Sequence, residues 1–496
     1  NARLGKQVIN WGEGLLFANG INSINPIDVN ALLAPGSEVK DALIPLNAVY
    51  ASIGVTQSLT LEAFGLLEWR ETVLPACGTF FSQTDLVGSG CWAGFIPNGW
   101  EPGYQGTVSG VSTSAANITL PRGKDITPDS HDQFGIAARI MADSIGTEFG
   151  LYFTQLNSNL PVVSGHTPDV TRFLYNGTPF PFASLNAARQ TLVGLTNNPL
   201  ATIALLPYGD YVVEFPEHIK LFGASFNTTM NLGLPGGDTS VSGEISVRKD
   251  QPFAIEDGDA LAGAVGLPSL SCANSPTPYD CYSEFKPGEY RPGYFKTDYY
   301  QAEMVFLHFF DQVLGADRWT AAFDIAGSYL KLPDRDKGLL NSAYNATLNF
   351  PNMPNVNWTT PGVGAYGTLP YSEFIQMTEQ AFAADGNLHN TVTRQEHDYA
   401  TSSAWGYKIR VSGDYNNVFA GVNLRPTISF SHDVRGTTPT PVTNFLQNRK
   451  AVGLALDAIY QNNYTIGVAY NDFFGAEPYN SMADRDYYTI SASAAF

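Results

Sequence analysis

The sequence has little charge and lacks the features of several large protein classes. Only 15% of its 496 residues are charged, with 46 acids and 27 bases, against about 25% in ordinary soluble proteins. No cluster of Lys and Arg occurs, so nucleic acid is excluded as a partner. No apolar run reaches the roughly 18 residues of a membrane-spanning helix. No positively charged, apolar leader is present at Asn1, so we expect that any secretion signal has been removed or was never part of this sequence.

Cysteine is also scarce, and the four cysteines form two local pairs. Cys77 and Cys91 make one pair, Cys272 and Cys281 the other, in stretches rich in Gly, Pro and Ser. Neither pair has the spacing of about two to four residues that a zinc knuckle uses. We therefore expect two loop disulfides, formed in an oxidising compartment.

Aromatic residues make up 12% of the chain, and apolar residues recur with a period of two throughout. In 134–143, for example, Phe134, Ile136 and Ile140 alternate with residues such as Gly135 and Arg139. Such segments are longer than the usual five or six residues of globular strands and match the roughly 9–11 that cross a bilayer. Aromatic residues gather at the segment ends, as in a membrane-interface girdle: Trp69, Trp319, Tyr329, Trp405, Tyr464, Tyr470 and Tyr488.

The pattern predicts an all-β fold, an antiparallel transmembrane β-barrel of about 14 strands forming a single domain over 1–496. The connections alternate between short and long, so both chain ends should lie on the periplasmic side and both cysteine pairs in outer loops. We expect long loops to enter the lumen as a partial plug, with short helices at Pro26–Lys40 and Ala183–Gln190. The strands are expected at 3–11, 45–56, 58–70, 133–143, 147–156, 218–230, 240–249, 300–312, 317–330, 403–414, 418–432, 450–460, 463–472 and 486–496.

The end of the chain carries a further pattern. Tyr488, Ile490 and the terminal Phe496 occupy alternate positions of the last expected strand. This ending resembles the C-terminal assembly signal of Gram-negative outer-membrane barrels, which implies the barrel-assembly machinery as a partner.

Several local motifs resemble a family of proteobacterial outer-membrane barrels catalogued as a domain of unknown function. They include Arg3–Glu13, Phe215–Ile219, Gly243–Arg248 and Ser431–Val434. The resemblance covers nearly the whole chain. It implies that the gene of this protein lies beside genes for inner-membrane transporters of the resistance-nodulation-division type. It implies no catalytic residues. Family members carry a further stretch of about a hundred residues before Arg3, which would raise the strand number to about 16–18 if it added strands.

Charged residues of both signs fall on the expected lumen face. They predict either ion pairs that hold the wall or a constriction in which a basic side faces an acidic side. Apolar residues such as Phe64 and Leu66 share this face, which suits either an oily substrate or packing against a plug. The candidates for the lumen or constriction are Glu62, Arg139, Glu244, Arg248, Asp324, Lys408, Arg410, Asp414 and Arg425.

No enzyme or cofactor is expected. The stretch 129–132 reads Asp-Ser-His-Asp, but no Gly-x-Ser-x-Gly or His-x-x-x-His accompanies it. Clustered carboxylates in the loops could bind calcium, but no EF-type loop is present, so they are interpreted as solvent-exposed acids. Those carboxylates are Glu256, Asp257, Asp259, Asp334 and Asp336.

The sequence favours an outer-membrane channel of a Gram-negative bacterium that moves small, hydrophobic molecules. General or ion-selective diffusion is one alternative, and a surface structural protein anchored by its barrel is another. The expected partners are outer-membrane lipids and lipopolysaccharide, with periplasmic and inner-membrane transporter proteins.

Overall fold

The structure is a computed structural model that describes most of the chain. It describes residues 1–33, 42–83, 86–91, 105–108, 111–114, 120–175, 177–185, 187–188, 191–192, 204–205, 207–254, 286–332, 400–461, 463–477 and 479–495. Several predicted features lie outside these residues, namely Cys272, Cys281, Phe496 and the carboxylates at 256, 257, 259, 334 and 336. In the described part, no helix is long and apolar enough to cross a membrane.

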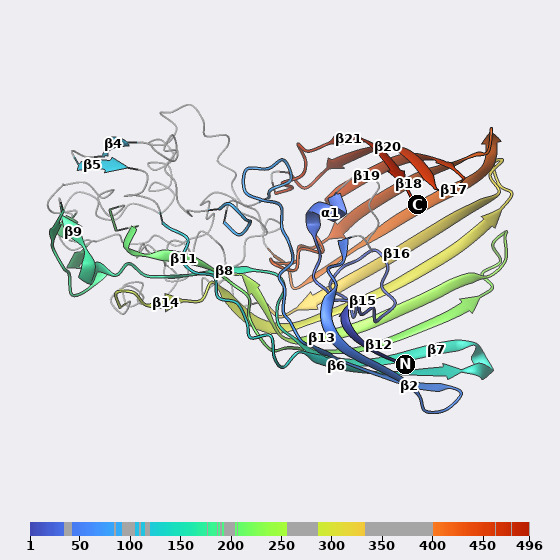
Figure 1. Cartoon of the computed structure of the whole chain (residues 1–496), viewed down its shortest axis with the longest axis horizontal. Helices are drawn as coiled ribbons and strands as arrows, with labels where there is room; N and C mark the ends of the chain where they lie inside the picture. Colours follow the sequence, from blue (N-terminus) through green and yellow to red (C-terminus); the bar gives the residue numbers. More distant parts are fainter. Residues whose placement is uncertain are drawn as a thin grey trace.

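Fourteen antiparallel strands form one sheet that curves into a barrel wall (Figure 1). Each strand pairs with the next wall strand along the chain, and no pairing between the first and last strands occurs within the described residues. The wall strands are β1 (Ala2–Gln7), β2 (Leu46–Gly54), β3 (Leu59–Leu66), β6 (Phe134–Ala142), β7 (Thr147–Leu156), β12 (Ile219–Met230), β13 (Thr239–Ala254), β15 (Tyr294–Asp311), β16 (Arg318–Leu330), β17 (Ser403–Phe419), β18 (Val422–Arg435), β19 (Lys450–Tyr460), β20 (Tyr464–Phe474) and β21 (Tyr487–Ala494).

The predicted fold is confirmed for all fourteen strands, although several strand ends differ. Strand β15 begins six residues earlier than expected, β13 and β17 end five residues later, and β3 ends four residues earlier. Strand β1 was expected to reach residue 11 and ends at Gln7 instead. The chain leaves the wall there because Ile9 and Trp11, which alternate as in a strand, are buried in a cluster on the inner face of the sheet. Both described chain ends lie at the end of the barrel that carries the short turns, since Ala2 pairs with Ala51 and Ala494 with Tyr464.

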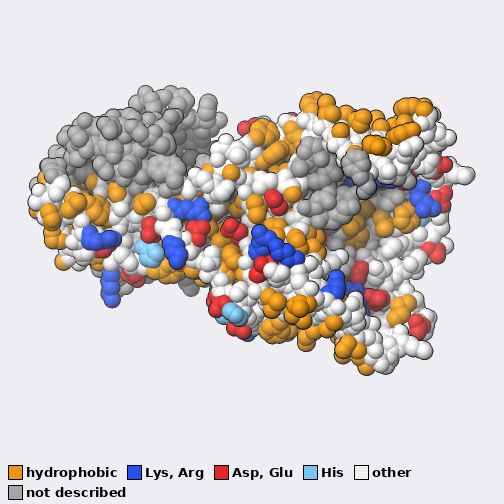
Figure 2. Space-filling view, viewed as in Figure 1, with side chains coloured by type: hydrophobic (Ala, Val, Ile, Leu, Met, Phe, Trp, Pro, Cys, Tyr) orange, Lys and Arg blue, Asp and Glu red, His pale blue; other side chains and the backbone are white. Residues whose placement is uncertain are grey.

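The outer face of the wall is apolar. Large hydrophobic side chains stand exposed at alternate positions of the strands, as a lipid-facing surface requires. Ile136 on β6 is 56% exposed and Ile490 on β21 is 81% exposed. Figure 2 shows such side chains gathered over the C-terminal strands, where Leu454, Leu456, Ile466, Val468, Tyr488 and Ile490 are exposed.

Described parts of the long connections lie beyond the barrel, at the opposite end from the short turns (Figure 1). A three-stranded sheet of β8 (Val162–His166), β11 (Asp210–Glu214) and β14 (Tyr290–Arg291) lies there. The smaller elements of the long connections are α1 (Val29–Leu33), which lies at the barrel, β4 (Gln105–Val108), β5 (Val111–Ser114), β9 (Leu174–Tyr175), β10 (Thr178–Pro179) and the 3-10 turn η3 (Val170–Arg172). The 3-10 turn η2 (Asp143–Ile145) lies in the short turn between β6 and β7. Helix α1 falls within the helix expected at Pro26–Lys40.

The disulfide predicted between Cys77 and Cys91 is present, in the long connection after β3. The loop that it closes also contacts the start of the last wall strand. The Arg485 guanidinium donates hydrogen bonds to the carbonyls of Phe80 and Ser82, and the rings of Phe81 and Tyr487 lie 5.3 Å apart. The disulfide loop therefore joins chain segments that follow β3 and precede β21.

Candidate functional site: a segment bound inside the barrel

The chain between β1 and α1 lies inside the curve of the wall (Figure 1). We call residues 8–25 the lumen segment. The contacts on its two sides differ in kind. Apolar side chains of the segment meet the early strands, and its backbone groups meet charged side chains of the later strands.

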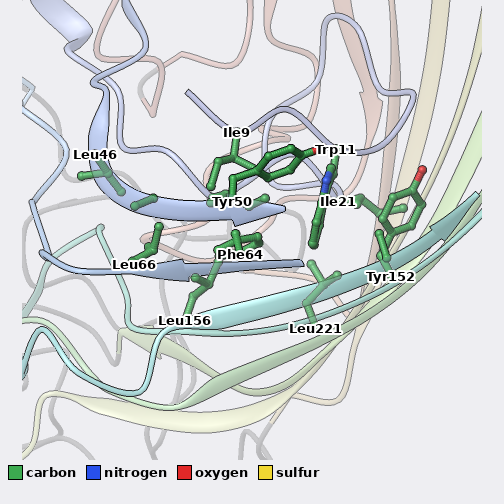
Figure 3. Close-up of a cluster of buried hydrophobic side chains, with 13 residues drawn as sticks. Ile9, Trp11, Ile21, Leu46, Tyr50, Phe64, Leu66, Tyr152, Leu156 and Leu221 are labelled. Carbon is green, nitrogen blue, oxygen red and sulfur yellow. The ribbon is translucent and has the colours of Figure 1, made fainter. Parts of the chain in front are cut away.

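The apolar side of the contact is a single buried cluster (Figure 3). Trp11 and Ile21 of the lumen segment are almost fully buried against side chains of β2, β3, β7 and β12, including Phe64 and Leu221. The rings of Trp11 and Phe64 lie 4.8 Å apart. The apolar inner face that the sequence predicted at Phe64 and Leu66 is therefore covered by the protein's own chain.

A charged network borders this cluster. The Trp11 indole Nε1 donates to Glu62 Oε2 at 2.6 Å, and Arg139 lies 3.4 Å from Glu62, 3.0 Å from Glu148 and 3.8 Å from Glu13. Glu13 also accepts a hydrogen bond from Asn227 at 2.9 Å. Burial raises the pKa of the Glu13 carboxyl, and the bond from Asn227 and the charge of Arg139 oppose that rise.

The opposite side of the lumen segment is bound by a row of carboxylates on β13, β15 and β16. Glu244 and Glu303 are directly opposite in the sheet register, and Asp324 is opposite Lys408 of β17. Glu303 and Asp324 share a face on neighbouring strands, because the register pairs Val305, two residues after Glu303, with Asp324. All three carboxylates are buried, and Asp324 is 0% exposed.

These carboxylates accept hydrogen bonds from the backbone of the lumen segment rather than from its side chains. Glu244 accepts from the N–H groups of residues 13, 14 and 21, at 2.7, 3.0 and 2.7 Å. Glu303 accepts from the N–H of Leu15 at 3.0 Å, and Asp324 from that of Leu16 at 2.7 Å. Hydrogen bonds to ionised acceptors are the stronger kind, each contributing roughly 1.5–3 kcal/mol.

Basic and amide side chains of the wall, together with Asn444 from the connection between β18 and β19, bind the carbonyl groups of the same segment. Lys408 Nζ donates to the Leu16 carbonyl at 2.7 Å, and Arg248 to that of Gly20 at 2.9 Å. Gln301 and Asn444 both donate to the Ala18 carbonyl, at 3.1 and 2.8 Å. The wall thus pairs donors and acceptors along one stretch of peptide backbone.

Glycine makes this close approach possible. A Cβ at Gly20 would lie 2.1 Å from Glu244 Oε1, and one at Gly14 would lie 2.8 Å from Glu303 Oε2. At Gly12 a Cβ would lie 2.5 Å from Glu244 Oε2, and the backbone there has a φ of +90°. The three glycines let the backbone meet the carboxylates directly.

A separate polar cavity of about 470 Å³ lies near the short-turn ends of β15 to β19. Two ion pairs line it: Arg318 lies 2.8 Å from Asp311, and Arg425 lies 2.7 Å from Asp414. This end of the lumen therefore has a charged lining that the lumen segment leaves uncovered.

The predicted lumen residues fall into three groups. Glu62 and Arg139 meet beside Trp11, while Glu244, Arg248, Asp324 and Lys408 bind the lumen segment. Asp414 and Arg425 line the polar cavity, and Arg410 on β17 is exposed. Among the predicted bases, Arg139 pairs with Glu62 and Arg425 pairs with Asp414.

Sequence reasoning missed Glu303, and it predicted a partial plug of long loops without assigning the plug to residues 8–25. Glu303 could have been found, because it is an acid in the otherwise apolar stretch that leads into Met304–Phe310. The segment had a weaker signal: Gly12, Gly14 and Gly20 are closely spaced among apolar residues. The Asp-Ser-His-Asp stretch lies away from this site, in a loop where His131 Nδ1 and Asp129 Oδ1 are 2.5 Å apart and both side chains are exposed.

Comparisons with known proteins place the chain in a family. The family described as "Protein of unknown function (DUF1302)" matches residues 1–496. No curated protein matches the sequence.

Solved structures give distant similarities. A ferric enterobactin receptor of Pseudomonas aeruginosa, PfeA, in complex with enterobactin is 9% identical, with a TM-score of 0.32, over 86% of this chain and 41% of that one. A FadL homologue of the same species is 11% identical, with a TM-score of 0.26, over 92% and 78%. The siderophore receptor PirA of Acinetobacter baumannii is 7% identical, with a TM-score of 0.29, over 90% and 54%.

The chain spans half or less of the length of the two PfeA structures. The family match, in contrast, extends over the whole sequence and agrees with the motifs that suggested it. The chain belongs to the family described as "Protein of unknown function (DUF1302)".

Proposed function

We propose that the protein is a gated channel in the outer membrane of a Gram-negative bacterium, which moves small, hydrophobic molecules. The observation that carries this proposal is the lumen segment, which is bound to the wall by its backbone and covers an apolar inner face. A general diffusion porin needs an open, water-filled lumen, whereas here a part of the lumen is occupied.

The covered surface supports a hydrophobic substrate. If the lumen segment moves away, Phe64, Leu66, Ala137 and Leu221 become part of the lining of the passage. An apolar lining favours an oily molecule over a sugar or an ion, because polar solutes lose hydrogen bonds to water there.

The apolar outer face supports the membrane location, because exposed hydrophobic side chains alternate along the strands. Outer-membrane lipids, lipopolysaccharide and the barrel-assembly machinery are the partners that this location implies. Periplasmic and inner-membrane transporter proteins are proposed as further partners, which would deliver or collect the substrate.

The experiment that tests the function compares the free and the crosslinked lumen segment. Cysteines replace Glu13 and Asn227, whose side chains are hydrogen-bonded, and a short bismaleimide joins them. Purified protein is then reconstituted, and both conductance in planar bilayers and uptake of a fluorescent fatty acid into liposomes are measured. The two single-cysteine variants, treated with the same reagent, are the controls.

We expect uptake by the uncrosslinked protein and its loss after crosslinking. A steady, large conductance that survives crosslinking would favour the diffusion porin. Neither uptake nor conductance in any form would favour a surface protein anchored by its barrel.

A further inference from the structure

Two of the wall carboxyl groups are diagonal neighbours on the inner face, because Asp324 pairs with Val305, two residues after Glu303. Both are carboxyl groups, which have no hydrogen to donate to each other when ionised. Glu303 Oε2 and Asp324 Oδ1 are buried and receive no hydrogen bond from any donor within the described residues. A proton between the two groups would satisfy both oxygens.

The charged groups around Glu303 and Asp324 also favour one bound proton. Glu244 adds a third carboxylate to the row, and the bases that face it are Lys408 and Arg248. Asp433 and Arg449, which lie next to Lys408, form an ion pair with each other at 2.7 Å. The row therefore has three acids against two bases, and one bound proton balances it.

The alternative to a proton is two adjacent anions that are both buried. Carboxylates so close together do not both ionise readily, because each repels the other and burial disfavours the charged form. The repulsion would be relieved if the lumen segment left and water reached the carboxylates. Loss of the proton should therefore favour release of the segment.

We propose that Glu303 and Asp324 form a binding site for one proton, and that this proton keeps the lumen segment bound to the wall. The proposal rests on the gated channel proposed above and supplies its regulation. The bound segment takes up the proton, so the segment is held at lower pH and released as the pH rises. One proton changes the ratio of released to bound segment by at most about tenfold per pH unit.

The test follows the lumen segment directly, with a nitroxide on Leu15→Cys, whose native side chain is 47% exposed. Cys272 and Cys281 are replaced by serine so that labelling is specific. Electron paramagnetic resonance then gives the mobile fraction of the label from about pH 5 to pH 10, spanning the titration that a buried carboxyl pair can show.

Three substitutions complete the design. In E303Q and D324N an amide donates to the remaining carboxylate at every pH, so it imitates the shared proton. Glu217→Gln removes a carboxylate in an outer loop, where it accepts a hydrogen bond from the backbone of Asp129, and serves as the matched control.

We expect the mobile fraction to rise with pH in the parent protein and in the Glu217→Gln control. The alkaline part of this rise should be absent in E303Q and D324N. The proposal is overturned if the parent shows no pH dependence, if E303Q keeps all of it, or if added sodium or calcium, rather than pH, controls the label. A pH-dependent label in a protein without uptake would instead contradict the proposed channel and leave the proton site standing.

Discussion

The two sides of the lumen segment are held by different forces. On the side of β2, β3, β7 and β12, Trp11 and Ile21 are buried in an apolar cluster. On the side of β13, β15 and β16, five backbone N–H groups meet three carboxylates. Apolar burial is non-directional and insensitive to pH, whereas the hydrogen bonds fix the position of each residue and depend on charge. The comparison suggests that one side provides affinity and the other provides control.

The largest effect is expected from the apolar side, with Trp11→Ala. Removing a buried Trp side chain costs roughly 3–5 kcal/mol, and this change also leaves Glu62 without the indole donor. We expect the Leu15 label to become mobile at every pH. Trp11→Phe should keep most of the packing and lose about 1 kcal/mol. If the two variants behave alike, affinity does not come from the apolar side.

Gly12→Ala should have the next largest effect, because it strains both sides at once. The new Cβ would meet Glu244 Oε2 at 2.5 Å and Ile21 Cβ at 2.8 Å, at a φ of +90°. Strain of this kind costs roughly 1–3 kcal/mol, measured as the change in the bound fraction of the label. Gly65→Ala is the matched control, since a Cβ there meets nothing within 4 Å. Equal results for the two glycines would contradict the observed contacts.

Glu244→Gln tests the directional side and should have a smaller effect. Three backbone N–H groups converge on the two oxygens of Glu244, and an amide offers only one oxygen to them. We expect the free energy of binding of the segment to weaken by about 2 kcal/mol, measured as the change in the bound fraction of the Leu15 label. Glu148→Gln removes an acid that binds Arg139 but no backbone group of the segment. An equal loss in that variant would show that general lumen charge, rather than backbone recognition, holds the segment.

The smallest effect concerns Glu13, which lies at the edge between the two sides. Burial raises its pKa above the ordinary value of 4.5. A carboxyl whose pKa is raised in the bound state contributes stability below its ordinary pKa, and that contribution is lost as the pH rises through the raised value. Glu13→Gln should therefore flatten the acidic part of the label's pH profile and leave its alkaline part unchanged. A change confined to the alkaline part would refute this assignment.

The sequence predicted the wall well because membrane strands repeat a simple rule. Each of the fourteen strands alternates between a lipid-facing and an inner residue, as Ile136 and Ala137 do, and period two can be read without tertiary information. The inner charges Glu244 and Asp324 were found for the same reason. These features depend on local pattern alone.

The lumen segment could not be predicted in the same way. Its residues have no period, since Trp11 and Ile21 pack on one side while the backbone between them binds the other. Because Ile9 and Trp11 alternate as in a strand, the sequence predicted that β1 would extend to residue 11, which is too far. The position of such a segment depends on contacts with strands far along the chain, which local pattern does not contain.

Those distant contacts have a consequence for how the molecule is assembled. The lumen segment is made early, directly after the first wall strand, yet its hydrogen-bond partners lie 231, 288 and 308 residues further along the chain. Contacts of such large sequence separation form late, because a long loop must be closed before they can form. The segment can reach its final place only when β13, β15 and β16 already stand side by side. Its arrival would thus mark the pairing of these three strands, and a label on Leu15 would report that step of folding as well as the first step of opening.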